Sequence, residues 1–137
     1  MIIGHGVDVV DVDRIRRLLT TMEEDFLLST FTRAERSVAC EEHERVLFFA
    51  GRLAAKEAVG KALGTGFTGE ISWLHVEILP GEKGHPQVRL TGPALAEAER
   101  LGIDRWLLSI SHVEAVAFAS AISVREGGGP LTAADPR

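Results

Sequence analysis

The chain has 137 residues, of which 45% are hydrophobic and 26% charged, enough for one domain around a single core. Its formal net charge of −5 argues against nucleic acid as a partner, because nucleic-acid binding needs a basic surface. No apolar run approaches the ~20 residues that span a bilayer, and the first residues do not resemble a signal peptide. With its lone cysteine, Cys40, the chain also fits a reducing compartment. We therefore expect a cytoplasmic protein that binds neither membranes nor nucleic acid.

The first predicted element is a strand over residues 2–10, in which apolar residues alternate with glycine or aspartate, as in a half-buried strand. On one face Asp8 follows two positions without a side chain, which leaves room for another group to approach the backbone beside a carboxylate. Aspartate is depleted in strands, so Asp8 is a candidate functional residue. Alternatively it caps the next helix, although Asp11 or Asp13 could do so equally well. The two faces consist of Ile3, Val7 and Val9, and of Gly4, Gly6 and Asp8.

Three helices are predicted before residue 64. A short one follows the strand, and a second begins at Thr32, because Thr32 and Glu35 have the spacing of a capping box. The longest runs from about residue 43 to 63 and ends at Gly64-Thr65-Gly66. Since it is apolar nearly all round, it should lie buried in the middle of the domain. The apolar stripe of the first helix is Ile15, Leu18 and Leu19.

The rest of the chain predicts strands and one further helix. Strands joined by hairpins, with helices between them, indicate an α+β fold: a mainly antiparallel sheet packed against the long central helix. We expect one domain over residues 1–125 and a disordered, glycine-rich tail over residues 126–137. The predicted elements are strands over residues 72–79 and 87–90, a helix between 91 and 102, and a hairpin of residues 106–111 and 115–124.

Glu57 is the second candidate functional residue. It shares a face of the long helix with apolar side chains, where a carboxylate is costly to bury unless it is paired, protonated or bound to a metal. An ion pair with Lys61, one turn on, is the simpler explanation. Alternatively, Asp8 and Glu57 hold Mg²⁺, which takes one or two carboxylates with phosphate oxygens and water, and Lys61 clamps a phosphate. The spacing does not establish that Asp8 and Glu57 meet.

Other residues could contribute to a phosphate site or to a protein interface. Arg52 and Lys56 lie on the long helix, and the Gly64-Thr65-Gly66 turn offers backbone amides, although a helix C-terminus is the wrong end for an anion. His112, at a predicted strand end, could reach a ligand, whereas a lone turn histidine is more often structural or exposed. The basic cluster is either a solvated helix face or a patch for an acidic protein; its members are Arg14, Arg16 and Arg17.

Several common catalytic motifs are missing from the sequence. Val9 stands where a dinucleotide fingerprint would need glycine, and Gly60-Lys61 does not complete a P-loop. Ser111 and His112 are adjacent in a strand and face opposite sides, and there is no nucleophile elbow. No catalytic thiol or triad is indicated.

These segments together resemble the holo-(acyl carrier protein) synthases, the short single-domain type of 4′-phosphopantetheinyl transferase. Order and spacing agree from residue 4 to about residue 124, and the Lys56-Glu57-Ala58 block with Lys61 downstream is the most specific element. The matching segments are Gly6-Val7-Asp8-Val9-Val10 with Arg14-Ile15, Phe31-Thr32-Arg33-Ala34-Glu35, Arg52-Leu53-Ala54-Ala55-Lys56-Glu57-Ala58, Lys61-Ala62-Leu63-Gly64-Thr65-Gly66, Gly84 with Pro86, and Ser109-Ile110-Ser111-His112 with Ala115, Ala117 and Ala119.

The resemblance implies a reaction and a role for each of these residues. The family moves 4′-phosphopantetheine from coenzyme A to a serine of apo-acyl carrier protein, in fatty acid biosynthesis, and releases 3′,5′-ADP. By this resemblance Asp8, Glu57 and Lys61 are catalytic: the two carboxylates hold Mg²⁺ on the pyrophosphate, and Lys61 neutralises charge. Glu57 is the candidate base for the serine proton, directly or through a water on the metal. The family is typically a homotrimer with coenzyme A bound between subunits.

Two sets of binding residues follow from the same resemblance, and two positions depart from the family pattern. Leu53 replaces an aromatic residue, and His85 replaces a lysine, so charge at position 85 becomes pH-dependent. The expected coenzyme A ligands are Arg52, Lys61, Gly64, Thr65, Gly66, His85, Ser111 and His112, and the expected carrier-protein ligands are Arg14, Arg16 and Arg17.

Two alternatives to the transferase stay open from the sequence. A non-catalytic binding module could use the same α+β trimer, with Glu57 and Lys61 as a structural pair and the basic cluster as a docking face. A coenzyme A thioester hydrolase would need a similar phosphate site. The first would leave a carrier protein unmodified, and the second would release free thiol from an acyl-coenzyme A.

Overall fold

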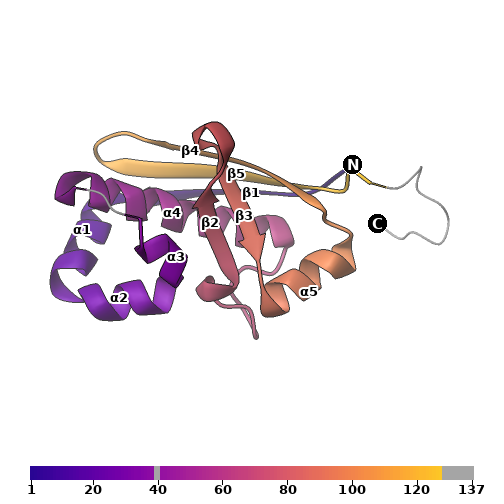
Figure 1. Ribbon diagram of the computed structural model, residues 1–137, viewed down its shortest axis with the longest axis horizontal. Coiled ribbons are helices and arrows are strands. Elements are labelled where there is room, and N and C mark those ends of the chain that lie inside the picture. Colours follow the sequence, from indigo (N-terminus) through magenta and orange to yellow (C-terminus); the bar gives the residue numbers. More distant parts are fainter. Residues whose placement is uncertain (39–40, 128–137) are drawn as a thin grey trace.

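The computed structural model describes residues 1–38 and 41–127, and within them the predicted α+β fold is confirmed. Figure 1 shows α1, α2 and α3 gathered at one end of the molecule, and α5 with the N-terminus at the other. The elements are β1 (Ile2–Asp11), α1 (Val12–Thr21), α2 (Glu23–Thr30), α3 (Arg33–Arg36), α4 (Glu42–Leu63), β2 (Val76–Pro80), β3 (Pro86–Leu90), α5 (Gly92–Leu101), β4 (Arg105–His112) and β5 (Val116–Val124), with 3₁₀ turns at Trp73–His75 and Glu82–Gly84.

The strands form two antiparallel units around α4. Three long strands pair in the order β1-β5-β4, and α4 packs along one face of this sheet (Figure 1). The β2–β3 hairpin contacts α4 through β2 and β4 through β3. Most side chains in the second half of α4 are buried, which confirms the prediction of a central helix.

The glycines of β1 determine how closely α4 approaches the sheet. A Cβ atom on Gly4 would lie 2.1 Å from the carbonyl oxygen of Ala62, and one on Gly6 would lie 2.0 Å from that of Ala58. The space beside Asp8 that the sequence predicted is therefore filled by the backbone of α4. Any side chain at these two positions would push the helix away from the strand.

Local signals explain where most helices begin and end. Asp11 is the N-cap of α1 and accepts a hydrogen bond from the backbone N–H of Asp13. Thr32 and Glu35 form the predicted capping box, although the helix they start, α3, spans only one turn. α4 ends at Gly64, whose φ of 85° is in the left-handed region that favours glycine.

Two elements differ from the prediction. The sequence patterns did not indicate α2, because its apolar residues 26–28 are consecutive and make no helical stripe. Met22 also joins α1 directly to α2 without a side-chain cap. Residues 73–75, predicted as the start of a strand, form a 3₁₀ turn capped by Ser72, and β2 begins only at Val76.

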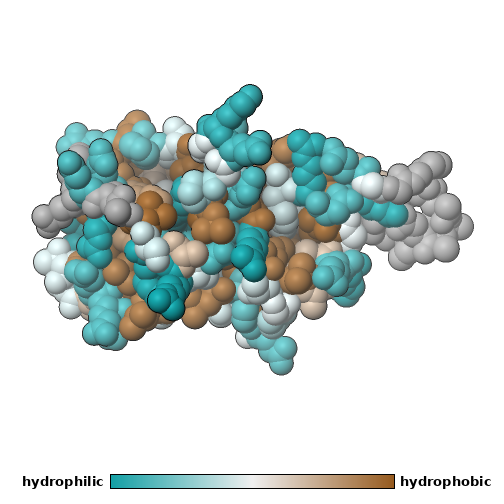
Figure 2. Space-filling view, viewed as in Figure 1, coloured by the Kyte–Doolittle hydropathy of each residue, from teal (hydrophilic) through white to brown (hydrophobic). Residues whose placement is uncertain are grey.

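The face of the three-stranded sheet turned away from α4 exposes several large apolar side chains among polar ones. On it Val9 pairs with Phe118, and Leu107 pairs with Ile122; the side chain of Val9 is 59% exposed and that of Leu107 is 45% exposed. The face seen in Figure 2, by contrast, carries apolar residues in separate patches among hydrophilic ones. Several large exposed apolar side chains on one sheet face, here interspersed with serines, are typical of an interaction surface. The β5 residues that face α4 are small and buried: Ala117, Ala119, Ala121 and Ser123.

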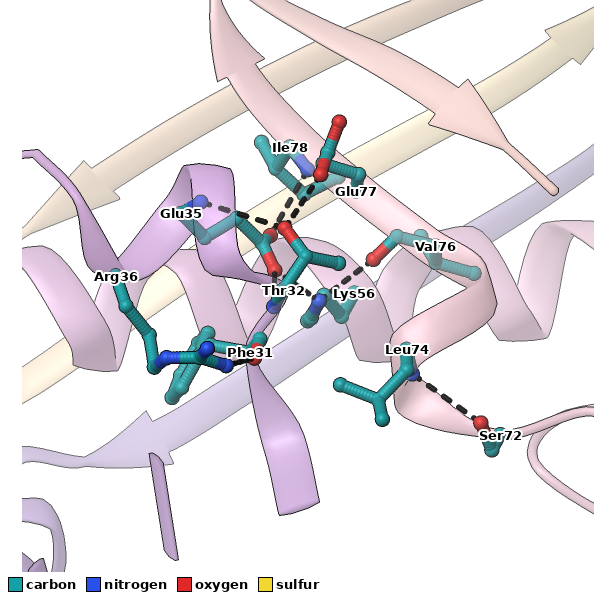
Figure 3. Close-up of polar contacts among 10 residues, drawn as sticks. All are labelled: Phe31, Thr32, Glu35, Arg36, Lys56, Ser72, Leu74, Val76, Glu77 and Ile78. Carbon is teal, nitrogen blue, oxygen red and sulfur yellow. Dashed lines mark hydrogen bonds and ion pairs between the residues drawn. The ribbon is translucent and has the colours of Figure 1, made fainter. Parts of the chain in front are cut away.

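A buried ion pair connects α3, α4 and β2 (Figure 3). Lys56 Nζ lies 2.5 Å from Glu35 Oε1, both side chains are fully buried, and Lys56 also donates to the carbonyl oxygen of Val76 at 2.6 Å. Glu35 accepts two further hydrogen bonds, from the backbone N–H groups of Thr32 and Ile78. The expectation that Lys56 supplies charge for a phosphate is therefore wrong, because its ammonium is enclosed in the core.

The C-terminal end of the described chain is held by Asp104. Its carboxylate accepts hydrogen bonds from the backbone N–H groups of Glu126, at 2.8 Å, and Gly127, at 3.0 Å, which are the first two residues of the predicted tail. The rest of that tail, residues 128–137, lies outside the described residues, as does Cys40. None of the helices in the described ranges combines the length and apolar character needed to span a bilayer.

Candidate active site

Asp8 and Glu57, 49 positions apart in the sequence, line one cavity of about 440 Å³. Asp8 lies on the face of β1 that packs on α4, and Glu57 lies on α4 one residue before Ala58, whose carbonyl meets Gly6. The close contact between strand and helix thus brings the two acidic residues to the same cavity. Asp8 does not act as a helix cap, because Asp11 has that role.

The electrostatics of the cavity show that the two carboxylates interact. Burial raises the pKa of the Glu57 carboxyl, and the Asp8 carboxylate raises it further. The cations Lys61 and Arg14 act in the opposite direction. A carboxyl whose ionised form is disfavoured by a second carboxylate, at the wall of the same cavity, is suited to take part in binding a cation.

Lys61 contacts β1 and not Glu57. Its Nζ lies 3.2 Å from Asp8 Oδ1 and donates to the carbonyl oxygen of Val7 at 2.9 Å. The ion pair between Glu57 and Lys61 that the sequence favoured as the simpler explanation is absent among the ion pairs of residues 1–38 and 41–127. Asp8 thus contacts Lys61 and shares a cavity with Glu57.

The donor set fits a hard divalent cation held by few protein ligands. Mg²⁺ is commonly bound through one or two carboxylates and completes its octahedron with water and phosphate oxygens. In the described part of the chain no group of three or more histidine, cysteine or acidic residues could hold a metal by itself. A cation on Asp8 and Glu57 would therefore depend on oxygen atoms from a substrate or from solvent.

Of the three clustered arginines, only Arg14 reaches this cavity. Arg16 forms an ion pair with Asp13 on the exposed side of α1. Arg17 is exposed on the same helix, outside the cavity lining. The structure therefore separates the predicted basic patch into one arginine beside the carboxylates and two on the solvent side of α1.

Arg52 and His112 line a second cavity, of about 570 Å³, between α4 and β4. The Arg52 guanidinium lies over the ring of Phe48, at 4.7 Å from its centroid, and its buried Nε has no hydrogen-bond partner. Burial lowers the pKa of Arg52, whereas the Glu35 carboxylate raises it. An unpaired buried N–H of a guanidinium beside a histidine is suited to an anionic ligand.

The remaining predicted ligands of coenzyme A lie outside both cavities. Ser111 is exposed and pairs with Phe118 on the sheet face turned away from α4, and His85 is exposed in the β2–β3 turn. The backbone N–H groups of Gly64 and Gly66 donate to the carbonyl oxygens of Lys61 and Gly60, so the turn after α4 uses both of them internally. Thr65 donates its hydroxyl to the carbonyl oxygen of Gly66. In one chain, the predicted residues therefore do not form a single site.

The sequence analysis missed the apolar wall of the first cavity. Part of this wall comes from α2, which the sequence did not predict, and part from Trp73, which stacks on Phe67 with ring centroids 4.2 Å apart. Leu53 had been noted as a departure from an aromatic residue, and Leu18 as part of the apolar stripe of the first helix, but neither as part of a cavity. A sequence signal for Phe26 would have required locating α2 first. The wall consists of Leu18, Met22, Phe26, Leu53 and Trp73.

Comparison with known proteins identifies the family. The model of the 4′-phosphopantetheinyl transferase superfamily matches residues 4–117. The holo-[acyl-carrier-protein] synthase of Desulforudis audaxviator is 48% identical over 128 residues, covering 92% of this chain and 97% of that protein. The synthase of Natranaerobius thermophilus is 42% identical over 122 residues, covering 89% and 97%.

Solved structures agree with the sequence matches. The holo-[acyl-carrier-protein] synthase from Neisseria meningitidis has a TM-score of 0.77 and 35% identity, covering 90% of this chain and 99% of that chain. The synthase from Bacillus anthracis, in complex with CoA (3′,5′-ADP), has a TM-score of 0.74 and 33% identity, covering 90% and 96%. With a family match over most of its length, the chain belongs to the 4′-phosphopantetheinyl transferase superfamily, in its family of holo-[acyl-carrier-protein] synthases.

Proposed function

We propose that this chain transfers the 4′-phosphopantetheine group of coenzyme A to a serine of apo-acyl carrier protein and releases 3′,5′-ADP. The observation that carries the proposal is the shared cavity of Asp8 and Glu57, with Lys61 on Asp8, in a chain of this family. These are the residues to which the family resemblance gives the catalytic roles. The proposed location is the cytoplasm, with which a single cysteine in 137 residues agrees.

The chain's own residues suit the group transfer. The serine oxygen forms a bond to the β-phosphorus of coenzyme A, the bond from that phosphorus to the bridging oxygen breaks, and 3′,5′-ADP leaves with the electron pair. Glu57, on the wall of the cavity that Asp8 also lines, is the proposed acceptor for the serine proton. Lys61 and Arg14 supply positive charge beside the cavity.

Mg²⁺ is the proposed cofactor, with Asp8 and Glu57 as its protein ligands. When bound, it would neutralise the charge of the pyrophosphate. The two-carboxylate donor set at one cavity and the effect of the Asp8 charge on the pKa of Glu57 support this assignment. Substrate phosphates would then complete the coordination, so that metal and coenzyme A are expected to bind together.

We further propose that the active protein is a homotrimer with coenzyme A bound between subunits. The exposed apolar face of the β1-β5-β4 sheet supplies a surface for self-association. The separation of the Arg52–His112 cavity from the Asp8–Glu57 cavity also fits a ligand that contacts two copies of the chain. Arg14 and the apolar wall of the first cavity are the proposed docking surface for the carrier protein.

Mass spectrometry of the carrier protein tests the function. Apo-carrier protein incubated with coenzyme A, Mg²⁺ and the wild-type chain should gain one phosphopantetheine. With Asp8→Ala or Glu57→Ala it should gain none, and full activity of both variants would remove the metal assignment. A binding module would leave the mass unchanged with the wild type as well, and a hydrolase would release thiol from an acyl-coenzyme A instead.

A further inference from the structure

The ammonium of Lys61 contacts the Asp8 carboxylate, which is also a proposed ligand of Mg²⁺. Its two acceptors, Asp8 Oδ1 at 3.2 Å and the carbonyl oxygen of Val7 at 2.9 Å, both belong to β1. The Asp8 side chain is 19% exposed, whereas that of Lys61 is 52% exposed. Lys61 could therefore leave this position by rotating into solvent, without any change in the packing of α4 on the sheet.

The charges around the cavity explain why the Lys61 ammonium lies against Asp8. Asp8, Asp25 and Glu57 line the cavity, and Arg14 is the basic residue among its lining residues. Asp25 lies on α2, Arg14 on α1 and Glu57 on α4, so three helices contribute charged groups to the lining of the cavity. Without a metal ion, the Lys61 ammonium offsets part of this negative charge at the strand.

We propose that Lys61 is the resident cation of the metal-free site and that binding of the divalent ion displaces it from Asp8 toward the phosphates of coenzyme A. This inference rests on the proposed function. An ammonium and a divalent ion that bind the same carboxylate repel each other, because both are positively charged and lie close together. Once displaced, Lys61 loses the Asp8 carboxylate, and because the proposed ion also takes Glu57, a phosphate of coenzyme A is the anion left for the ammonium.

The displacement couples the two ligands. A metal ion that binds alone must break the contact between Lys61 and Asp8 and leaves the ammonium unpaired. A metal ion that binds with coenzyme A breaks the same contact, but the phosphate takes over the ammonium. Coenzyme A should therefore raise the metal affinity, and by thermodynamic reciprocity the metal should raise the affinity for coenzyme A by the same factor.

Titration of Mn²⁺ followed by electron paramagnetic resonance, with and without coenzyme A, tests the inference independently of turnover. Without coenzyme A, Lys61→Met should bind Mn²⁺ roughly 2- to 5-fold more tightly than the wild type, the range expected for removal of one partly exposed ion pair. Addition of coenzyme A should improve Mn²⁺ binding less in Lys61→Met than in the wild type. Lys61→Ala repeats the test with a smaller side chain, and circular dichroism checks that both variants are folded.

Lys83→Met is the matched control, because Lys83 is an exposed lysine in the β2–β3 turn and its replacement removes the same charge. An unchanged Mn²⁺ affinity in Lys61→Met, or an equal rise in Lys83→Met, overturns the inference. Absence of Mn²⁺ binding in every protein, with or without coenzyme A, overturns it together with the metal assignment. Tight Mn²⁺ binding with no transfer of phosphopantetheine would instead refute the proposed function alone.

Discussion

The buried ion pair between Lys56 and Glu35 gives the sharpest prediction about stability. In Lys56→Met, the fully buried Glu35 carboxylate loses the cation that it contacts, and the carbonyl oxygen of Val76 loses a donor. Removing one partner of a buried pair typically costs about 3–5 kcal/mol, since the remaining charge is left without compensation. We expect the free energy of unfolding of Lys56→Met to fall by this amount.

The double variant Lys56→Met/Glu35→Gln should be more stable than the sum of the two single changes predicts. It contains no buried charge, and the amide oxygen of the new side chain can still accept from the backbone N–H of Thr32. What remains is two backbone groups without a partner, the N–H of Ile78 and the carbonyl oxygen of Val76, which cost about 1–3 kcal/mol each. Each single change costs about 3–5 kcal/mol, so at mid-range values the coupling energy of the cycle should be about 4 kcal/mol.

Urea unfolding followed by far-ultraviolet circular dichroism measures all four proteins. Each must be studied at the same chain concentration, because dissociation of an oligomer contributes to apparent stability. The exposed pair of Arg100 and Glu97 on α5 provides a control cycle, for which a coupling of about 0.3–0.5 kcal/mol is expected. Additivity of the Lys56 and Glu35 changes within about 0.5 kcal/mol would refute the claim that these charges compensate each other in the core.

Three further predictions concern the cavity, the strand–helix contact and the sheet face. In metal-free protein, Glu57→Gln should raise the free energy of unfolding by less than about 1 kcal/mol at neutral pH. Because the folded-state pKa of Glu57 is raised above its ordinary value of 4.5, this gain should grow as the pH rises from 4.5 to the folded-state pKa and should vanish below 4.5. A gain in stability that persists in acid would contradict this prediction. Gly6→Ala should cost roughly 1–3 kcal/mol in urea unfolding and lower transferase activity, because its Cβ would lie 2.0 Å from the carbonyl oxygen of Ala58; wild-type values for both would refute the contact. Leu107→Asp should sediment as a monomer with an unchanged circular dichroism spectrum, and an oligomer of wild-type size would exclude this sheet face as the interface.

The fold could largely be predicted because its local signals are strong and agree with one another. The capping box at Thr32, the glycine after α4 and the alternation in β1 each indicated an element that the structure contains. α2 was missed because its boundaries carry no such signal: Met22 is a poor cap, and consecutive apolar residues fit a strand as well as a helix. Residues 73–75 were assigned to a strand because a single turn of 3₁₀ helix is too short to show a period.

The candidate site could be predicted only in part, because pairing between distant residues is decided by packing. Asp8 and Glu57 were identified from the cost of placing a carboxylate in a strand or on an apolar helix face, and the structure places both at one cavity. The partner of Lys61 was not predictable in this way. Helical spacing favours Glu57, four residues before it, but the small β1 glycines let α4 approach so closely that Asp8 and the Val7 carbonyl come within reach of Nζ.

Asp8 and Glu57 are alternative partners for the Lys61 ammonium, and the close approach of α4 to β1 at the two glycines decides between them. With a larger residue at Gly4 or Gly6, α4 would move away from β1. We then expect the Lys61 ammonium to pair with Glu57 on its own helix and not with Asp8 on the strand. The acidic residues would then remain in the sequence but would no longer line one cavity. The two glycines thus set the distance across which any shared cation must be held, although neither has a side chain that could touch it.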